Sequence, residues 1–159
     1  MVYHSSLWLR TSAGYSFGEV DESFANFYFG GFGNNWIDHA SIKRFRQYYS
    51  FPGVELNEIA GVDYGRVIAE WSLPPIRFRH LGFPAFYATW IRPAVFASAL
   101  MTNVDIEILR RTFYNIGMQI DFRMQLLSHN NLTFSVGYAT AFEKSRKISD
   151  EFMLSLKVL

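Results

Sequence analysis

Histidines and nucleophilic side chains are common sources of catalysis, and this sequence holds them in no useful arrangement. The four histidines are scattered, at His4, His39, His80 and His129. Their spacing is not that of a zinc site, and the chain has no cysteine to supply thiolate ligands. Asp38 and His39 are adjacent, but no serine or cysteine nucleophile pattern accompanies them. We therefore expect no catalytic residue and no metal ligand.

Signals for phosphate or nucleic-acid binding are equally weak. The stretch Gly30-Gly31-Phe32-Gly33 does not open a helix of Rossmann type, so it predicts close backbone approach in a barrel strand. The formal net charge of +1 lacks the basic excess of a general nucleic-acid binder. The sequence therefore predicts no cofactor and no nucleic-acid partner.

Charged residues inside otherwise apolar stretches are more informative. Successive side chains of a β-strand point to opposite faces, so Arg66 and Glu70 would share one face, as would Asp121 and Arg123. We predict that these four residues and Arg92 face the lumen of a barrel. Basic partners are available in a long loop, at Lys43, Arg44 and Arg46. Solvation of the lumen charges in a wet pore is the alternative.

The stretch Arg111–Leu127, RTFYNIGMQIDFRMQLL, has the clearest strand pattern in the chain. Its even-numbered side chains are mainly apolar, whereas most odd-numbered ones are polar or small. A helix would scatter Asp121 and Arg123 among apolar neighbours. The run is longer than the usual strand of about five or six residues, and a strand tilted across a bilayer needs roughly nine to eleven. We predict a transmembrane β-strand with its even-numbered side chains toward lipid.

Six further segments repeat the period of two. They are Leu7–Phe17, Phe24–Phe32, Tyr64–Leu73, Ala85–Leu100, Leu132–Phe142 and Glu151–Leu159. Phe24 and Phe32 fall on the inward parity of their segment, which makes that strand less regular. Pro74-Pro75 is expected to end the third of these segments, with Ile76–Pro84 as a link, because proline cannot donate to a strand ladder.

The segment from Phe83 to Met101 could instead be a transmembrane helix. A central Arg92 costs about 2.5–3.5 kcal/mol on insertion scales, and Pro93 disfavours a helix interior. We therefore expect a strand here, bulged near Pro93, with Arg92 inward. That placement sends four side chains toward lipid, those of Tyr87, Ile91, Val95 and Ala97.

The connections differ greatly in length. The longest, about residues 33–61, contains a possible helix capped by Asp38 and a turn at Pro52-Gly53. With Leu159 in the periplasm, two connections would be short periplasmic turns, Gly18–Ser23 and Ser128–Asn131. Two would be longer extracellular loops, Gly33–Gly61 and Glu143–Asp150.

Together these patterns predict an all-β protein, an antiparallel transmembrane β-barrel segment of about seven strands. Residues 1–159 would form one partial barrel domain. Bacterial single-chain barrels have even strand numbers, and no signal peptide precedes the first strand, so we expect a piece of a longer chain. A soluble up-and-down barrel that binds a small apolar ligand would show the same alternation and is the alternative.

From Asn26 to Leu159 the chain resembles the C-terminal barrel of the bacterial surface antigen superfamily, which includes BamA/TamA-like outer-membrane assembly factors and two-partner secretion transporters. The resemblance rests on FYFGGFGNNWID (Phe27–Asp38), on SFPGVELNEIAGVDYGRVIAEWSLP (Ser50–Pro74), and on five strands after the long loop. It implies that the chain is the C-terminal part of a sixteen-stranded barrel whose long sixth extracellular loop folds into the lumen.

The resemblance also points to the loop tip. The family carries a Val-Arg-Gly-Phe/Tyr-like motif there, and its arginine meets an aspartate on the second strand after the loop. Here the tip reads Phe51-Pro52-Gly53-Val54, and Ser98 stands where the aspartate would be. Joint loss of both charges avoids an unpaired buried charge. Pro52 and Gly53 are therefore candidate site residues, although a standard insertase or secretion mechanism is in doubt.

The resemblance implies a non-enzymatic role at the bacterial outer membrane, in protein assembly, transport or membrane anchoring. The implied partners are outer-membrane lipid, the rest of the barrel, upstream domains of a longer chain, and substrate outer-membrane or secreted proteins. A small esterase-like or lipid-modifying barrel is disfavoured, because no nucleophile–base pair is visible.

Overall fold

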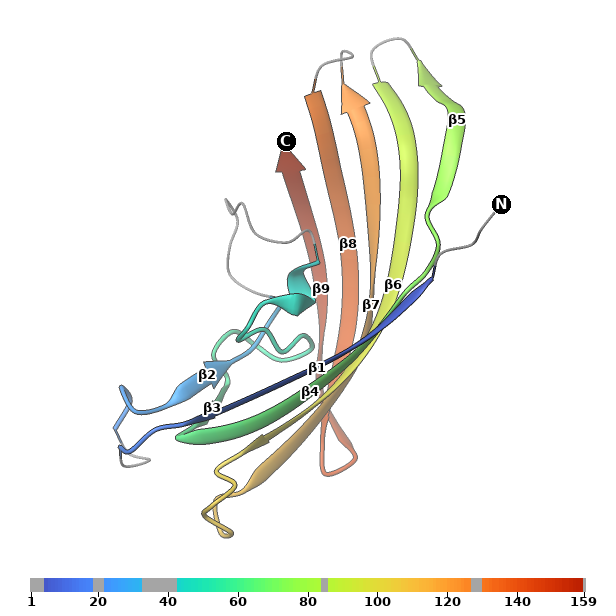
Figure 1. Ribbon diagram of the computed structural model, residues 1–159. Coiled ribbons are helices and arrows are strands. Elements are labelled where there is room, and N and C mark those ends of the chain that lie inside the picture. The colour runs from blue at the N-terminus through green and yellow to red at the C-terminus, as the bar shows by residue number, and fades with distance from the viewer. Residues whose placement is uncertain (1–4, 19–21, 33–42, 84–85, 127–129, 159) are drawn as a thin grey trace.

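The computed structural model describes residues 5–18, 22–32, 43–83, 86–126 and 130–158 (Figure 1). The chain is all-β, and its only described helical turn is the 3-10 helix η1 (Arg44–Arg46). The strands are β1 (Ser6–Tyr15), β2 (Phe27–Phe29), β3 (Ile59–Gly61), β4 (Asp63–Ser72), β5 (Ile76–Phe83), β6 (Phe86–Thr102), β7 (Arg111–Leu126), β8 (Asn130–Glu143) and β9 (Arg146–Val158).

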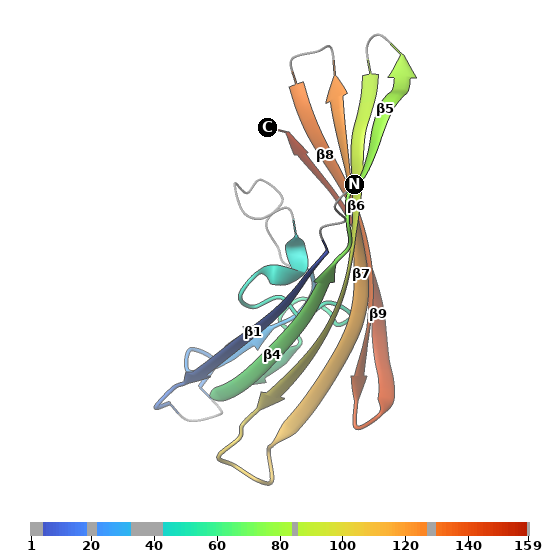
Figure 2. The ribbon, with the colours of Figure 1, turned by 45° about the vertical axis from the view of Figure 1, so that its right-hand side comes forward.

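Seven of these strands form one large antiparallel sheet, which confirms the predicted all-β, antiparallel class. Its order is β1-β4-β6-β7-β8-β9, with β5 paired to β6, and β2 and β3 form a separate two-stranded sheet. Figures 1 and 2 show a tall, curved wall with β2, β3 and η1 against its concave side. We call the concave side the inner face and the convex side the outer face. In the described residues, β1 and β9 each pair with one neighbour only.

Strands β4 and β5 are two parts of one long strand. β4 pairs with residues 94–102 of β6, and β5 pairs with residues 86–91 of the same strand. Between them the amide of Leu73 donates to the carbonyl oxygen of Pro93 at 3.1 Å. The prediction of a link over Ile76–Pro84 was therefore wrong. Pro74-Pro75 removes two donors from the ladder, but the chain keeps its direction and pairing resumes.

The predicted wall strand Phe24–Phe32 was also wrong. β1 pairs directly with β4, from Ser6 opposite Ser72 to Tyr15 opposite Asp63. Within the predicted segment only Phe27–Phe29 is a strand, and it pairs with β3 on the inner face. The aromatic side chains that disturbed the alternation explain the error, since Phe32 is buried against Phe96 of the wall.

Strand β7 has the phase that its sequence predicts. It lies between β6 and β8 and pairs with both along nearly its whole length. Its odd-numbered side chains Phe113, Asn115, Gln119 and Asp121 are buried on the inner face. Its even-numbered side chains Tyr114, Ile116 and Met118 are exposed on the outer face. The strand thus buries polar groups and exposes apolar ones.

Strand β6 has the expected irregularity, a bulge. The position of this bulge changes the face that was predicted for one residue, Tyr87. The register shifts between Ala88 and Trp90, so that Trp90 lies opposite Arg123 and Tyr87 lies opposite Gln125. Directly opposed residues share a face, so Tyr87 belongs to the inner face. The prediction of a lipid-facing Tyr87 was wrong, because one inserted residue reverses the parity beyond the bulge.

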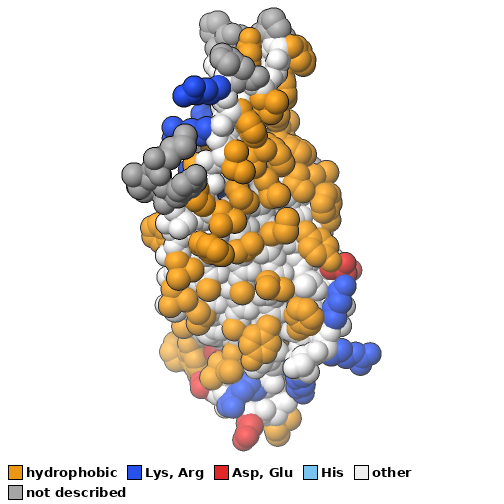
Figure 3. All heavy atoms as spheres, turned by 90° about the vertical axis from the view of Figure 1, so that its right-hand side faces the viewer, with side chains coloured by type: hydrophobic (Ala, Val, Ile, Leu, Met, Phe, Trp, Pro, Cys, Tyr) orange, Lys and Arg blue, Asp and Glu red, His pale blue; other side chains and the backbone are white. Residues whose placement is uncertain are grey.

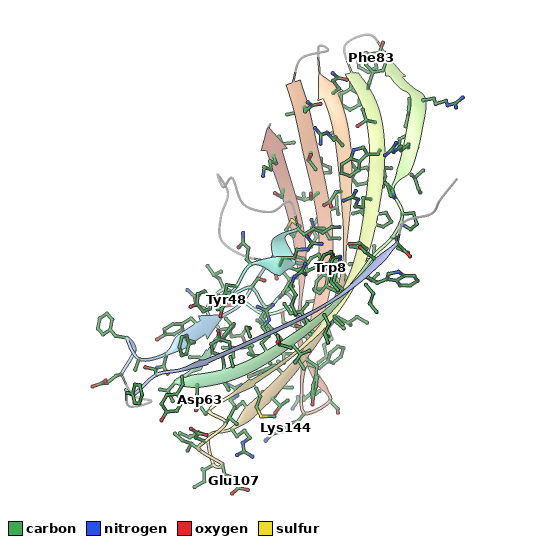
Figure 4. The ribbon with its side chains drawn as sticks, in the orientation of Figure 1. Trp8, Tyr48, Asp63, Phe83, Glu107 and Lys144 are labelled. Carbon is green, nitrogen blue, oxygen red and sulfur yellow. The ribbon has the colours of Figure 1, made fainter. Side chains whose placement is uncertain are left out.

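The two ends of the wall differ in their connections. At one end, the turn end, β5 meets β6 and β7 meets β8; at the other, the loop end, β6 meets β7 through residues 103–110. Figure 4 shows Phe83 at the turn end, with Glu107 and Lys144 at the loop end.

Three predicted connections need correction. The predicted loop Glu143–Asp150 is a two-residue hairpin at Lys144 and Ser145, both with positive φ, and β9 begins at Arg146. The charges of this segment belong to strand ends. Gly18–Ser23 and Gly33–Gly61, predicted at opposite ends, both belong to the connection between β1 and β4.

The described part of the chain contains no helix that is long and apolar enough to cross a membrane. The segment considered as a transmembrane helix, from Phe83 to Met101, lies at the end of β5 and along β6, with residues 84–85 outside the described part. The preference for a strand there is confirmed.

Candidate functional site

A long connection packs on the inner face and forms the candidate functional site. We call its described part, residues 30–32 and 43–59, the inner loop. The helix predicted after Asp38 appears here only as η1, and Asp38 itself lies outside the described residues. Two apolar clusters join the connection to the wall: Phe29, Phe51, Val54 and Ile59 with Tyr64, Leu100, Phe113 and Ala141, and Phe32 and Phe45 with Ala94, Phe96, Ala139 and Met153.

The glycine-rich start of the inner loop has the predicted close backbone approach, but in a different place. A Cβ atom on Gly30 would lie 2.0 Å from the carbonyl oxygen of Glu55. The contact is therefore within the loop, not within a wall strand.

The carboxylate of Glu70 is the first polar anchor of the inner loop. Glu70 projects from β4, is completely buried and accepts hydrogen bonds from Nε and Nη2 of Arg46 in η1. It also accepts from Nη1 of Arg10 at 2.8 Å and from Oγ of Ser72 at 2.7 Å. Two guanidinium groups and a hydroxyl group therefore satisfy the buried charge.

Asp121 of β7 is the second polar anchor. Its Oδ2 lies 3.1 Å from Nζ of Lys43, and both side chains are buried. Its Oδ1 accepts from Nε2 of Gln119 at 2.6 Å and from Oγ of Ser135 at 2.8 Å. The buried Asp121 carboxylate is therefore satisfied by two neutral donors as well as by the Lys43 ammonium.

The predicted pairing between lumen charges and the loop is thus present for two of the loop's basic residues. Arg46 binds Glu70 and Lys43 binds Asp121. Arg44 belongs to η1, but its side chain lies outside the described part. Whether these charges serve a function beyond anchoring stays a prediction.

Arg66 is buried on the inner face beside the end of η1. Its Nη1 donates to the carbonyl oxygen of Tyr48 at 2.8 Å and to that of Gln47 at 3.4 Å. Carbonyl groups that follow a helical turn carry partial negative charge, which a guanidinium group complements. Arg66 and Glu70 therefore hold successive parts of the same loop segment, although they do not bind each other.

The loop tip is held by a neutral chain of hydrogen bonds. Nδ2 of Asn115 donates to the carbonyl oxygen of Pro52 at 2.8 Å, and Oδ1 of Asn115 accepts from Oγ of Ser98 at 2.6 Å. Pro52 and Ser98 are the two positions where the resemblance expects an arginine and an aspartate. The structure brings them together through Asn115, with uncharged groups in place of the ion pair.

Gly53, next to Pro52, is held by Glu151 of β9. Its amide donates to Oε2 of Glu151 at 3.1 Å, and the amide of Phe32 donates to Oε1 of the same carboxylate at 3.1 Å. One carboxylate thus joins two parts of the inner loop. Gly53 has a φ of 97°, and a Cβ atom there would lie 2.7 Å from the backbone nitrogen of Ala141. Only glycine fits this position without strain.

Arg92 and Arg123 lie on the inner face but outside these anchors. Arg92 is directly opposite Asp121 in the register, yet its guanidinium group lies over the ring of Trp90, 5.2 Å from the centroid. Arg123 is directly opposite Trp90. Both belong to the half of the wall nearer the turn end.

Three residues of the site escaped prediction. Asn115 and Gln119 were placed on the inner parity of β7 but were not singled out, because neutral amides are common in polar lumens. Glu151 has the same parity as Ser155 and Lys157 and was taken as the first residue of its strand. Its role depends on where the loop tip meets the wall, which strand parity cannot reveal.

The polar contacts of this arrangement hold the inner loop in place on the sheet. The carboxylates of Glu70, Asp121 and Glu151 are engaged with loop cations or loop amides. Among the described residues, no three histidine, aspartate or glutamate side chains gather as metal ligands would. The site therefore anchors a loop across β4, β7 and β9.

Comparisons of this chain with protein-family models, with curated proteins and with solved structures found no match.

Proposed function

We propose that this chain is a non-enzymatic segment of an outer-membrane β-barrel of surface-antigen type, with a role in membrane-protein assembly, transport or anchoring. In this proposal the outer face contacts lipid, and the inner loop closes part of the lumen. The partners are outer-membrane lipid, the remaining strands of a larger barrel, domains upstream in a longer chain, and proteins handled at the membrane.

The observation that carries the proposal is the reversed polarity of the wall. Leu154 and Ile116 on the outer face are each 57% exposed, whereas Gln119 on the inner face is completely buried. The exposed apolar set spans the sheet and includes Leu7, Leu9, Val67, Trp71, Val95, Tyr114, Met118, Phe152 and Leu156. A soluble barrel would bury its apolar face and hydrate its polar one. Lipid is the solvent that suits this pattern.

The distribution of charge on the outer face supports the same proposal. Figure 3 shows apolar side chains over most of the height of the face, with most charged side chains gathered toward the loop end. β6 and β7 have 17 and 16 residues, more than the roughly nine to eleven that a tilted strand needs to cross a bilayer. The excess length lets strands emerge into water at the loop end.

The order of elements supports the surface-antigen type. One wall strand, β1, precedes the inner loop, and five long strands follow it when β4 and β5 are counted as one. This is the arrangement that the sequence resemblance implies after a lumen-folded loop. Among the described residues, β1 and β9 each have one edge without a partner strand, and further barrel strands would pair there.

Single-cysteine labelling tests the proposal, because the chain has no cysteine of its own. We expect Ile116→Cys, in the full chain reconstituted into vesicles, to be shielded from a charged maleimide and to react after denaturation. Ile108→Cys is the matched control, since Ile108 is 94% exposed in the connection between β6 and β7. It should react at once. Equal rates at both positions in folded, vesicle-bound protein would sink the membrane proposal.

A further inference from the structure

Basic residues line up across the inner face near the turn end. In the register of the sheet, Arg77 of β5 lies opposite Trp90 of β6, and Trp90 lies opposite Arg123 of β7. The row continues through Thr133 of β8 to Lys157 of β9. Directly opposed residues of antiparallel strands share a face, so all five side chains belong to the inner face. Arg92 follows one inner position below Trp90.

Beyond Asp121, which lies directly opposite Arg92, this half of the wall contains no acidic residue. Neither aspartate nor glutamate occurs in residues 71–104, 122–142 or 152–159. The same ranges hold five of the 15 basic residues: Arg77, Arg79, Arg92, Arg123 and Lys157. The whole chain has a net charge of only +1, so the acidic residues lie elsewhere. The turn end is therefore strongly positive, whereas the chain as a whole is nearly neutral.

The guanidinium groups of this row are available for a ligand. Among the described residues, Arg77, Arg92 and Arg123 take part in no ion pair, in contrast to Arg46 and Lys43 at the inner loop. The nearest inner-face acid, Asp121, is occupied by Lys43, Gln119 and Ser135. The guanidinium group of Arg92 lies over the ring of Trp90.

We propose that Arg77, Trp90, Arg92 and Arg123 form a binding site for a soluble multivalent anion of the phosphate type. From here on, the row means these four residues. Guanidinium groups bind phosphate oxygens in pairs, and three of them on adjacent strands suit a ligand with several charges. Arg77 and Arg123 are two strands apart, roughly 10 Å between backbones, which one monovalent ion cannot span. A positive surface on the concave side of the sheet also raises the local concentration of anions.

This inference goes beyond the proposed function and rests on the inner face, not on contact with lipid. The row lies on the same face as the buried inner loop, so its ligand would come from water. Phosphate groups of lipid would instead meet the outer face. The two proposals can therefore fail separately: shielding of Ile116→Cys tests the membrane, and anion binding tests the row.

Calorimetric titration of the full chain in uncharged detergent, with sodium tripolyphosphate as the probe, tests the site. We expect saturable binding that weakens at least tenfold in Arg77→Gln/Arg123→Gln. The matched control is Arg110→Gln/Arg146→Gln, which removes the same charge at the loop end. Its affinity should stay within about twofold of the wild type, because a bound anion interacts mainly with charges within a Debye length.

Three outcomes would overturn the proposal: no saturable binding by the wild type, an equal loss in the control, or no loss in the double variant. Arg77→Lys/Arg123→Lys is a control for misfolding, because it keeps both charges and loses only the paired guanidinium donors. We expect its affinity to lie between those of the wild type and Arg77→Gln/Arg123→Gln. Flotation with vesicles that contain phosphatidylglycerol separates the ligand sources. Flotation that depends on Arg77 and Arg123 would identify a lipid headgroup and overturn the soluble ligand.

Discussion

Lys43→Met should lower the free energy of unfolding by about 3–5 kcal/mol, because it leaves the buried Asp121 carboxylate without its cation. Lys43 and Asp121 lie 3.1 Å apart between the inner loop and β7, and neither can recover hydration in the folded protein. Removal of one partner of a buried pair is costly because the other keeps its full desolvation penalty. Urea unfolding in vesicles gives the measurement.

The double variant Lys43→Met/Asp121→Asn should recover most of this loss. Asparagine keeps an oxygen that can accept from Gln119 and Ser135, and no charge remains to be paired. Replacement of a complete buried ion pair by neutral groups is often neutral for stability. If the double variant is no more stable than Lys43→Met, the loss comes from packing of the Lys43 side chain and not from its charge.

The ion pair Lys147–Asp150 is a matched control. It has the same separation of 3.1 Å, but both side chains are about half exposed. Lys147→Met should therefore leave the free energy of unfolding nearly unchanged. A similar loss for Lys43→Met and Lys147→Met would contradict the role assigned to burial.

Gly53→Ala should detach the tip of the inner loop from the wall. The residue has a φ of 97°, and an added Cβ would meet backbone atoms of Thr140 and Ala141 at 2.8 and 2.7 Å. Backbone atoms of a central strand cannot rotate away as a side chain can. Backbone strain and overpacking of about 1–3 kcal/mol each give an expected loss of about 3 kcal/mol.

Limited trypsin digestion reports on the tip directly. Lys43 is buried and Arg46 is bound to Glu70, so both sites should resist trypsin in the wild type and be cut in Gly53→Ala. Gly65→Ala is the control, since Gly65 lies in β4 and a Cβ there meets nothing within 4 Å. Resistance of Gly53→Ala equal to that of Gly65→Ala would show that the tip tolerates a side chain.

Strand parity predicted most of the wall from sequence, because most inner positions of β4, β7 and β8 are polar or small and most outer ones are apolar. The inner-face positions of Glu70 and Asp121, and their pairing with the inner loop, followed from the same parity. The identity of each partner did not, since it depends on how η1 lies across the wall.

Errors arose where local chemistry and pairing disagree. Pro74-Pro75 reads as the end of a strand, yet pairing to β6 resumes at Ile76. The aromatic residues of the segment from Phe24 to Phe32 read as a wall strand, yet most of that segment packs on the inner face. The bulge before Trp90 moved Tyr87 to the inner face. Such features depend on contacts between segments that are distant in the sequence, and the sequence of a single strand does not predict those contacts.

The proline pair between β4 and β5 also makes the wall uneven in its resistance to opening. Pro74 and Pro75 face the part of β6 that contains Pro93, so three amide donors are missing at one level of the sheet, and Leu73 supplies the bond between the two strands there. Amide protons exchange with solvent where local opening costs least. We therefore expect the free energy of local opening to be lower for the β5–β6 hairpin than for the rest of the sheet, because β7, β8 and β9 pair without such an interruption from one end to the other.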